Sequence, residues 1–75
     1  MAELVIFIAK SLVDNPEQVV VTETDTASGL LLELRVAAED MGKVIGKQGR
    51  IAKSIRAVIR AAAAKENLNV ILDII

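Results

Sequence analysis

Apolar residues near the start of the chain recur with the period of an α-helix. At about 100° per residue, one side of a helix over residues 3–13 carries Leu4, Val5, Ile8, Ala9 and Leu12, and the other side carries Ile6, Phe7 and Lys10. Asp14-Asn15-Pro16 ends this helix, because a residue before proline is pushed out of the helical region. The pattern therefore predicts a helix whose core side is the one that carries Leu4 and Leu12.

Two stretches after this helix have the character of strands. Residues 17–24 are rich in β-branched side chains, and residues 30–36 alternate between apolar and other positions. The alternation places Leu30, Leu32, Leu34 and Val36 on one face and Leu31, Glu33 and Arg35 on the other. Residues 25–29 have turn chemistry and include a glycine, so we expect a β-hairpin.

The second half of the chain predicts two helices. Glu39 and Asp40 are expected to start a short helix over residues 41–45, with Asp40 as its N-cap or as a first-turn acid, and this helix ends at Gly46. A longer helix begins after Gly49 and continues to about residue 65, where an alanine run has high helix propensity.

A third strand is expected at the end of the chain. Asn67 is suited to terminate the long helix, and residues 68–75 then alternate, with Leu68, Val70, Leu72 and Ile74 on one face. The order α-β-β-α-α-β predicts an α+β fold, a single domain over residues 1–75 with its helices packed on one face of a three-stranded mixed sheet.

Charge is segregated along the chain, although the net charge is only −1. Residues 1–40 hold eight acidic and two basic residues, a net charge of −6. Residues 41–65 hold no acid and seven bases, which are Lys43, Lys47, Arg50, Lys53, Arg56, Arg60 and Lys65. A phosphate group responds to charges within a Debye length of about 8–10 Å, so the local excess makes this segment a candidate for nucleic-acid contact. A solvated helix face would give the same charge pattern.

The missing residue types exclude several kinds of site. The chain has no cysteine and no histidine, which excludes disulfides, thiolate and histidine metal ligation, and histidine acid–base chemistry. We expect no cofactor and no enzyme activity. The longest apolar stretch in the N-terminal region is far shorter than the roughly 20 residues that span a bilayer, and Glu3 stands where a signal peptide is positively charged. A cytoplasmic protein without membrane contact is therefore expected.

The hydrophobic content of 53% is high for a small chain. A small body has too much surface to bury all of it, so part of it is expected to face a partner such as a second copy. Ile6 and Phe7 on the outer side of the first helix are the favoured candidates, and Ile71 and Ile75 on the second face of the last strand are the alternative.

The motif Gly46-Lys47-Gln48-Gly49 lies between the two predicted helices. Two glycines three residues apart allow a sharp turn and a close approach of a ligand to the backbone. The amides stand at the N-terminus of the following helix, which favours an anion, and Lys47 and Arg50 add positive charge. The loop therefore suits a sugar–phosphate backbone, although a plain helix–helix turn would use the same glycines.

The helix after the loop extends its basic surface. Arg50, Lys53, Arg56 and Arg60 fall within about a third of the helix circumference. The opposite arc is apolar and is expected to be core; it carries Ile51, Ala52, Ile55, Val58, Ile59 and Ala62. One ligand can therefore contact both the loop and the basic side of the helix.

These residues resemble a known family. Val44-Ile45-Gly46-Lys47-Gln48-Gly49, with the apolar positions Ala52 and Ile55, resembles the KH domain in its type II arrangement, which has an extra helix and strand before the β-α-α-β motif. Residues 11–16 and 40–53 look like the small single-domain bacterial KH proteins, the KhpA group. The resemblance covers essentially the whole chain.

The resemblance implies binding of single-stranded RNA, about four nucleotides with their backbone clamped by the G-x-x-G loop, and a role as an RNA chaperone or post-transcriptional regulator. The implied RNA-binding residues are Gly46 and Gly49 for close approach, Lys47, Gln48 and Arg50 for phosphate contact, Lys43, Lys53 and Arg56 for further charge, and Ile45 for the groove floor. It also implies homodimers, a larger KH-containing partner protein, and control of cell elongation and gene expression.

One departure concerns aromatic residues. Phe7 is the only aromatic residue and lies in the first helix. Base stacking on protein side chains, worth about 1–3 kcal/mol per base elsewhere, is therefore expected to be absent. We expect weak binding with loose sequence preference.

Three other functions fit the sequence less well. A helix-turn-helix DNA reader conflicts with the two-glycine turn and the flanking strands. A nucleotide hydrolase would need four residues between the glycines and Ser or Thr after the lysine, whereas residues 42–48 offer three residues and then Gln48. A protein-interaction module that has the KH fold but no RNA role is the main alternative.

Overall fold

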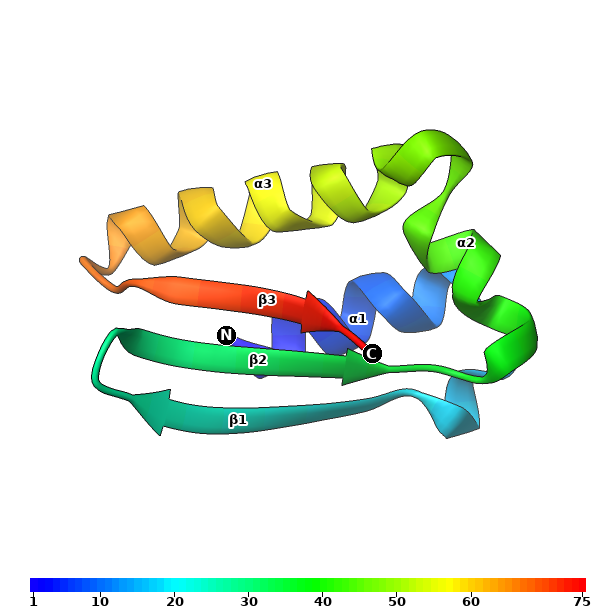
Figure 1. The fold of residues 1–75 in the computed structure, drawn as a ribbon, viewed down its shortest axis with the longest axis horizontal. Helices are drawn as coiled ribbons and strands as arrows, with labels where there is room; N and C mark the ends of the chain where they lie inside the picture. The colour runs from blue at the N-terminus through cyan, green and yellow to red at the C-terminus, as the bar shows by residue number, and fades with distance from the viewer.

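The structure, a computed structural model, describes all residues from 1 to 75. Its helices and strands follow the predicted order, which confirms the α+β class, and their bounds are α1 (Ala2–Leu12), β1 (Val20–Thr26), β2 (Gly29–Arg35), α2 (Met41–Ile45), α3 (Arg50–Lys65) and β3 (Val70–Ile74). The strand order is β1-β2-β3, with β1 antiparallel and β3 parallel to β2. Figure 1 shows α3 lying along β3, α1 behind the sheet, and α2 at the end of the molecule where β2 leads into it.

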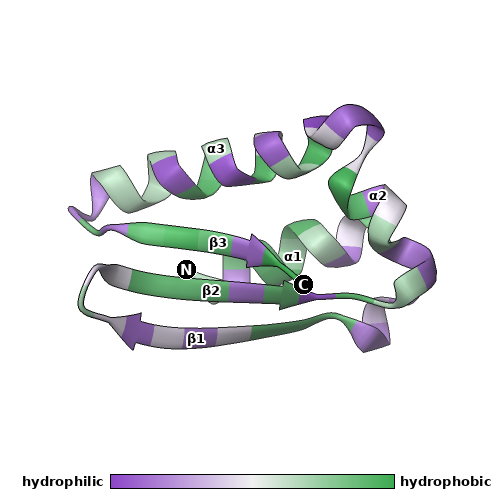
Figure 2. Ribbon diagram, viewed as in Figure 1, coloured by the Kyte–Doolittle hydropathy of each residue, from purple (hydrophilic) through white to green (hydrophobic).

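The core lies between the sheet and the helices on one of its faces. The fully buried large side chains are Leu32 and Leu34 of β2, Val5 of α1, Val44 of α2 and Ile59 of α3, together with the polar Asp40. Each buried aliphatic side chain contributes about 1.5–3 kcal/mol, so the middle strand and α3 supply much of the stability. In Figure 2 strands β2 and β3 are largely hydrophobic, while hydrophilic bands recur along the outer side of α3.

The hairpin differs from the predicted one at both ends. Residues 16–18 form a short 3-10 turn instead of the start of a strand, and β1 continues through residues 25 and 26. Thr26 pairs with Gly29 across a two-residue loop. The Thr26 hydroxyl donates to the Gly29 carbonyl at 2.7 Å and accepts the Ser28 amide at 3.2 Å. These local bonds close the turn two residues later than the composition suggested.

The prediction that Asn67 terminates α3 is confirmed. Asn67 adopts a left-handed conformation with φ of 58°. The amides of Leu68 and Asn67 donate to the carbonyls of Ala63 and Ala64, at 2.8 and 3.2 Å, which is the Schellman arrangement. Because this turn occupies residues 66–69, β3 begins at residue 70, later than predicted.

The core sides of α1 and α3 are rotated relative to the prediction. In α1 the buried residues are Ala2, Val5 and Ala9, while Leu4, Ile8 and Leu12 are only partly buried. In α3 the buried residues are Ala52, Ile55, Ile59 and Ala63, while Ile51 and Ala62 are partly buried and Val58 is 47% exposed. The small residues allow both helices to lie close to the sheet, and the larger apolar side chains on their flanks remain accessible.

Candidate nucleic-acid interface

The loop of residues 46–49, here called the GxxG loop, connects α2 and α3 at one end of the molecule (Figure 1). Lys47 and Gln48 are exposed, and so is Arg50, the first residue of α3. Three of the four loop residues have positive φ: Gly46 at 73°, Gln48 at 56° and Gly49 at 75°. The backbone is therefore folded tightly, and its side chains point into solvent.

The two glycines have different surroundings. At Gly49 a Cβ would meet nothing within 4 Å, so this side of the loop is open to a ligand. At Gly46 a Cβ would lie 2.5 Å from Ile51 Cγ1, so that side is filled by the protein itself. Close approach of a ligand, predicted for both glycines, has open space beside Gly49, whereas Gly46 allows the loop to pack on Ile51.

The N-terminus of α3 adjoins the loop, and the amide of Arg50, its first residue, donates to the Lys47 carbonyl of the preceding 3-10 turn. Gly49 precedes the helix, and no side chain caps it with a hydrogen bond. The first amides of a helix carry a partial positive charge of about half a unit, and in a 16-residue helix this end attracts anions. Lys47 and Arg50 stand beside it, so the loop combines backbone donors with two side-chain cations.

The basic residues of α3 continue from the loop toward β3. Lys53 and Arg60 are exposed, and Arg56 is partly buried because its Nε donates to the Leu72 carbonyl of β3 at 3.3 Å. Beyond this bond lies a cavity of about 220 Å³, here called the β3 hollow, lined by Arg56, Ile59, Arg60, Val70, Ile71 and Leu72. Arg50, Lys53, Arg56 and Arg60 thus lie along one side of α3, and Lys47 lies in the loop at its start.

The opposite side of α3 is apolar. Ile51, Ser54, Ile55 and Val58 of α3 and Ile8 and Leu12 of α1 line a second cavity of about 310 Å³, here called the apolar groove. None of these side chains is charged. Sequence analysis missed this groove because it assigned the same residues to the core; a helical wheel cannot distinguish a side chain at the centre of a buried face from one at its flank.

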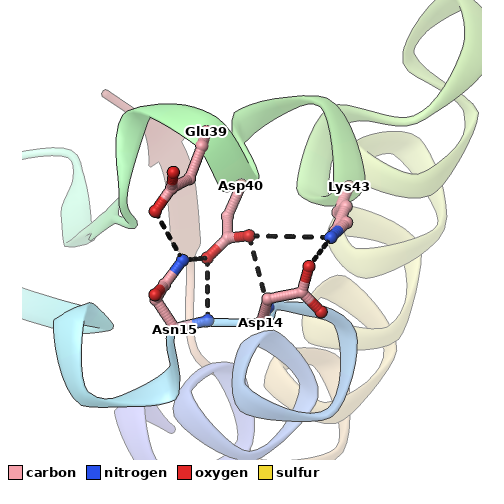
Figure 3. A network of polar contacts seen from close by, with 5 residues as sticks. All are labelled: Asp14, Asn15, Glu39, Asp40 and Lys43. Carbon is pink, nitrogen blue, oxygen red and sulfur yellow. Dashed lines mark hydrogen bonds and ion pairs between the residues drawn. The ribbon is translucent and has the colours of Figure 1, made fainter.

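A network of polar contacts joins the start of α2 to the segment after α1 (Figure 3). The Asp40 carboxylate is fully buried and accepts the backbone amides of Asp14 and Asn15 at 3.2 and 3.0 Å. It also accepts Asn15 Nδ2 at 3.0 Å, and the same nitrogen donates to Glu39 at 2.8 Å. The network ties the end of α1 to the start of α2, 25 residues further along the chain.

Asp40 occupies the predicted N-cap position of α2, but its side chain makes no capping hydrogen bond. The carboxylate is turned inward to the Asp14–Asn15 amides instead. Burial opposes ionisation of Asp40, but the hydrogen bonds from Asn15 and from the two amides, with the charge of Lys43, outweigh it. The pKa of Asp40 is therefore below its ordinary value, and the carboxylate is ionised at neutral pH.

Lys43 and Ile45 are placed differently from the other predicted site residues. Lys43 Nζ donates to the Asp14 carboxylate and lies 3.9 Å from Asp40 Oδ1. This hydrogen bond is the main reason why the pKa of Lys43 is raised. Its charge is therefore balanced within the network. Ile45 ends α2 and is 37% exposed, directly before the loop.

No helix has the length and apolar character that a bilayer crossing requires. No three acidic side chains come together as a group that could hold a metal ion.

Comparison of the sequence with known proteins identifies a family. A sequence model described as "KhpA/KhpB, KH domain" matches residues 2–74. Proteins named "RNA-binding protein KhpA" from Clostridium perfringens and Clostridium acetobutylicum are 63% and 61% identical over all 75 residues and over their own full lengths. One from Treponema pallidum is 47% identical over 97% of this chain and 91% of its own length. No solved structure matches the chain.

The match covers the loop and every helix and strand described above. Members of this family are KH-domain proteins named for RNA binding, and the family is not one of enzymes. The chain belongs to the KhpA/KhpB family of KH-domain proteins.

Proposed function

We propose that this protein binds single-stranded RNA, with the sugar–phosphate backbone lying across the GxxG loop. The observation that carries the proposal is the open side of Gly49, next to the uncapped N-terminus of α3 and the exposed Lys47 and Arg50. Phosphate oxygens at this point meet backbone donors and two cations at once. Relatives up to 63% identical carry the name RNA-binding protein, which supports the same reading.

The rest of the strand follows α3 away from the loop. Lys53, Arg56 and Arg60 continue the positive surface, and the β3 hollow at its end offers apolar walls to a base. Lys43, whose charge is balanced by Asp14 and Asp40, supports the loop from α2 instead of meeting a phosphate.

The chemistry of the surface suits binding that reads the backbone more than the bases. Neither the loop nor the β3 hollow contains an aromatic side chain, because the only one in the chain, Phe7, is on α1. Without stacking, affinity rests on phosphate contacts. Such binding is suited to an RNA chaperone or a broad post-transcriptional regulator in the cytoplasm, and we propose that role.

The dependence of affinity on salt tests this proposal. If three or four of Lys47, Arg50, Lys53, Arg56 and Arg60 meet phosphates, log affinity for a single strand falls linearly with log salt, with a slope of roughly −2 to −3 at about −0.7 per phosphate. Fluorescence anisotropy with a labelled RNA oligonucleotide measures the slope. A flat response contradicts phosphate binding, and better competition by duplex DNA than by single strands would favour the helix-turn-helix reading.

We also propose that the protein forms a homodimer through the apolar groove. The groove has no charged lining, and Val58 and Phe7 on the outer sides of α3 and α1 are 47% and 70% exposed. A symmetric dimer needs one surface with both a recess and projecting side chains, and this surface has both. The same surface would serve a larger KH-containing partner.

The open face of the sheet is a poorer dimer surface. Ile71 and Ile75 are about half exposed there, but Glu33 and Asp73 are register partners on adjacent strands of the same face. Stacking two copies by this face would bring like charges together, which is unfavourable. The alternative that the chain is only a protein-interaction module requires the GxxG loop to have no ligand. The exposed Lys47 and Gln48 of the loop, with Arg50 beside it, speak against that.

A further inference from the structure

Ile51 belongs to both surfaces described above. It follows the GxxG loop in the first turn of α3 and is partly buried. On one side its Cγ1, Cβ and Cδ1 would lie 2.5, 2.8 and 2.9 Å from a Cβ at Gly46, so the side chain packs directly on the Gly46 backbone. On its other side Ile51 is part of the lining of the apolar groove.

Backbone hydrogen bonds hold the ends of the loop, from the Gly46 amide to the Gly42 carbonyl at 2.8 Å and from the Gly49 amide to the Gly46 carbonyl at 3.3 Å. No side chain caps the 3-10 turn of residues 47–49 or the start of α3. Gly46 is held at φ 73° and ψ −179°, a conformation essentially restricted to glycine, and Gln48 is a non-glycine residue in the left-handed region. A loop held in such conformations needs neighbouring atoms to keep it there, and Ile51 is the side chain that contacts Gly46.

We propose that Ile51 is a positioning residue that couples the apolar groove to the GxxG loop, so that a second copy seated in the groove strengthens RNA binding at the loop. This inference rests on the proposed RNA site and on the proposed dimer. The partner covers the open side of Ile51 and restricts its movement. Gly46 is then fixed before RNA arrives, and less binding energy is spent on ordering the loop.

Linkage makes the coupling reciprocal. If dimerisation raises RNA affinity by some factor, bound RNA tightens the dimer by the same factor. Couplings between sites are typically about 5-fold or more. Dimerisation should strengthen RNA binding and not block it, because the groove and the basic residues lie on opposite sides of α3 and do not compete for space.

The experiment measures the dimer dissociation constant by sedimentation, with and without a saturating RNA hexanucleotide. An oligonucleotide of this length keeps avidity between two loops from imitating coupling. In the parent we expect about a 5-fold or greater tightening by RNA. In Ile51→Ala the tightening should fall below about 2-fold, and in Ile51→Val, which keeps the branched Cβ on Gly46, it should be intermediate. An Ile51→Ala protein that does not fold leaves the Ile51→Val comparison to decide.

A second readout uses Val58→Glu, which blocks the groove two helical turns from Ile51. Amide hydrogen exchange at residues 47–49 of the RNA-free protein should be faster in this variant than in the parent, while core amides of β2 are unchanged. Equal loop exchange in both proteins overturns the coupling, as does a dimer whose dissociation constant is the same with and without bound hexanucleotide. A protein that never dimerises also overturns it. A protein that dimerises but does not bind the hexanucleotide refutes the RNA site itself, which separates the two failures.

Discussion

The two glycines of the GxxG loop are equivalent in the sequence but not in the structure. Gly49 is left-handed at φ 75° and ψ 13°, with free space where a side chain would stand. Gly46 has a conformation restricted to glycine and packs on Ile51. The motif was recognisable from spacing alone. The separate roles were not, because they depend on which atoms lie against each Cα.

Alanine substitutions at the two glycines should therefore differ in stability. Gly49→Ala should lower the free energy of unfolding only by the strain of a side chain in the left-handed conformation, about 1–2 kcal/mol. Gly46→Ala adds steric overlap with Ile51, typically about 1–3 kcal/mol, to backbone strain of about 1–3 kcal/mol, so it should be clearly the more destabilising. Urea denaturation of both variants measures this. An equal loss in the two variants would show that Ile51 moves aside without cost.

At the scale of helices and strands, the sequence predicted the order, α2 and the start of α3 correctly. The predicted bounds of β1 and β3 were wrong where local hydrogen bonds, at Thr26 and at the end of α3, decided the turn. The hydrogen bonds of the Asp40 carboxylate were not predicted, because its partners Asp14 and Asn15 are distant in the sequence. Proximity of that kind follows only from the packed arrangement of α1 against α2.

The Asp40 network predicts a pH-dependent contribution to stability. Because the pKa of Asp40 is lowered in the folded protein, its stabilising effect is complete above the ordinary aspartate pKa of about 3.9 and is lost as the pH falls through the folded value. Asp40→Asn should therefore lower the melting temperature most at neutral pH, and the difference from the parent should shrink below about pH 4.

Thermal melts between pH 7 and pH 3 test this, with Asp25→Asn as the matched control. Asp25 is exposed on β1 and forms no ion pair, so its substitution should change the melting temperature little at any pH. If Asp40→Asn lowers the melting temperature by the same amount at every pH, the charge of the carboxylate is irrelevant and only its shape matters.

At the scale of the whole molecule, α3 lies between two different surfaces. Its basic side faces the β3 hollow, its apolar flank faces α1, and its buried residues lie between them. The high hydrophobic content anticipated an exposed partner surface. The position of this surface was predicted only in part. Phe7 is exposed as expected, but the apolar groove is lined mostly by residues that the pattern had assigned to the core.

The dimer proposal predicts different outcomes for three surface variants. Val58→Glu introduces a charge into the apolar groove and should give a monomer in sedimentation, and Phe7→Glu should weaken the dimer. Ile71→Glu, on the open face of the sheet, should leave the dimer intact. These side chains are 47%, 70% and 47% exposed, so all three variants should fold. A dimer that survives Val58→Glu but dissociates in Ile71→Glu would place the interface on the sheet.

The central claim is that RNA phosphates lie on the GxxG loop, and a charge reversal there tests it most directly. The variant Lys47→Asp/Gln48→Asp keeps both glycines and changes only exposed side chains. Lys10→Asp/Gln18→Asp is the matched control, because it replaces the same two residue types at exposed positions in α1 and the turn before β1. Circular dichroism should show both variants folded.

The deciding measurement is the affinity of these proteins for a labelled single-stranded RNA by fluorescence anisotropy. The loop variant should show no binding over the range in which the parent saturates, because its carboxylates repel the phosphates, and the control should lose only a small fraction of the affinity. A folded loop variant that binds the RNA as tightly as the parent would contradict the account.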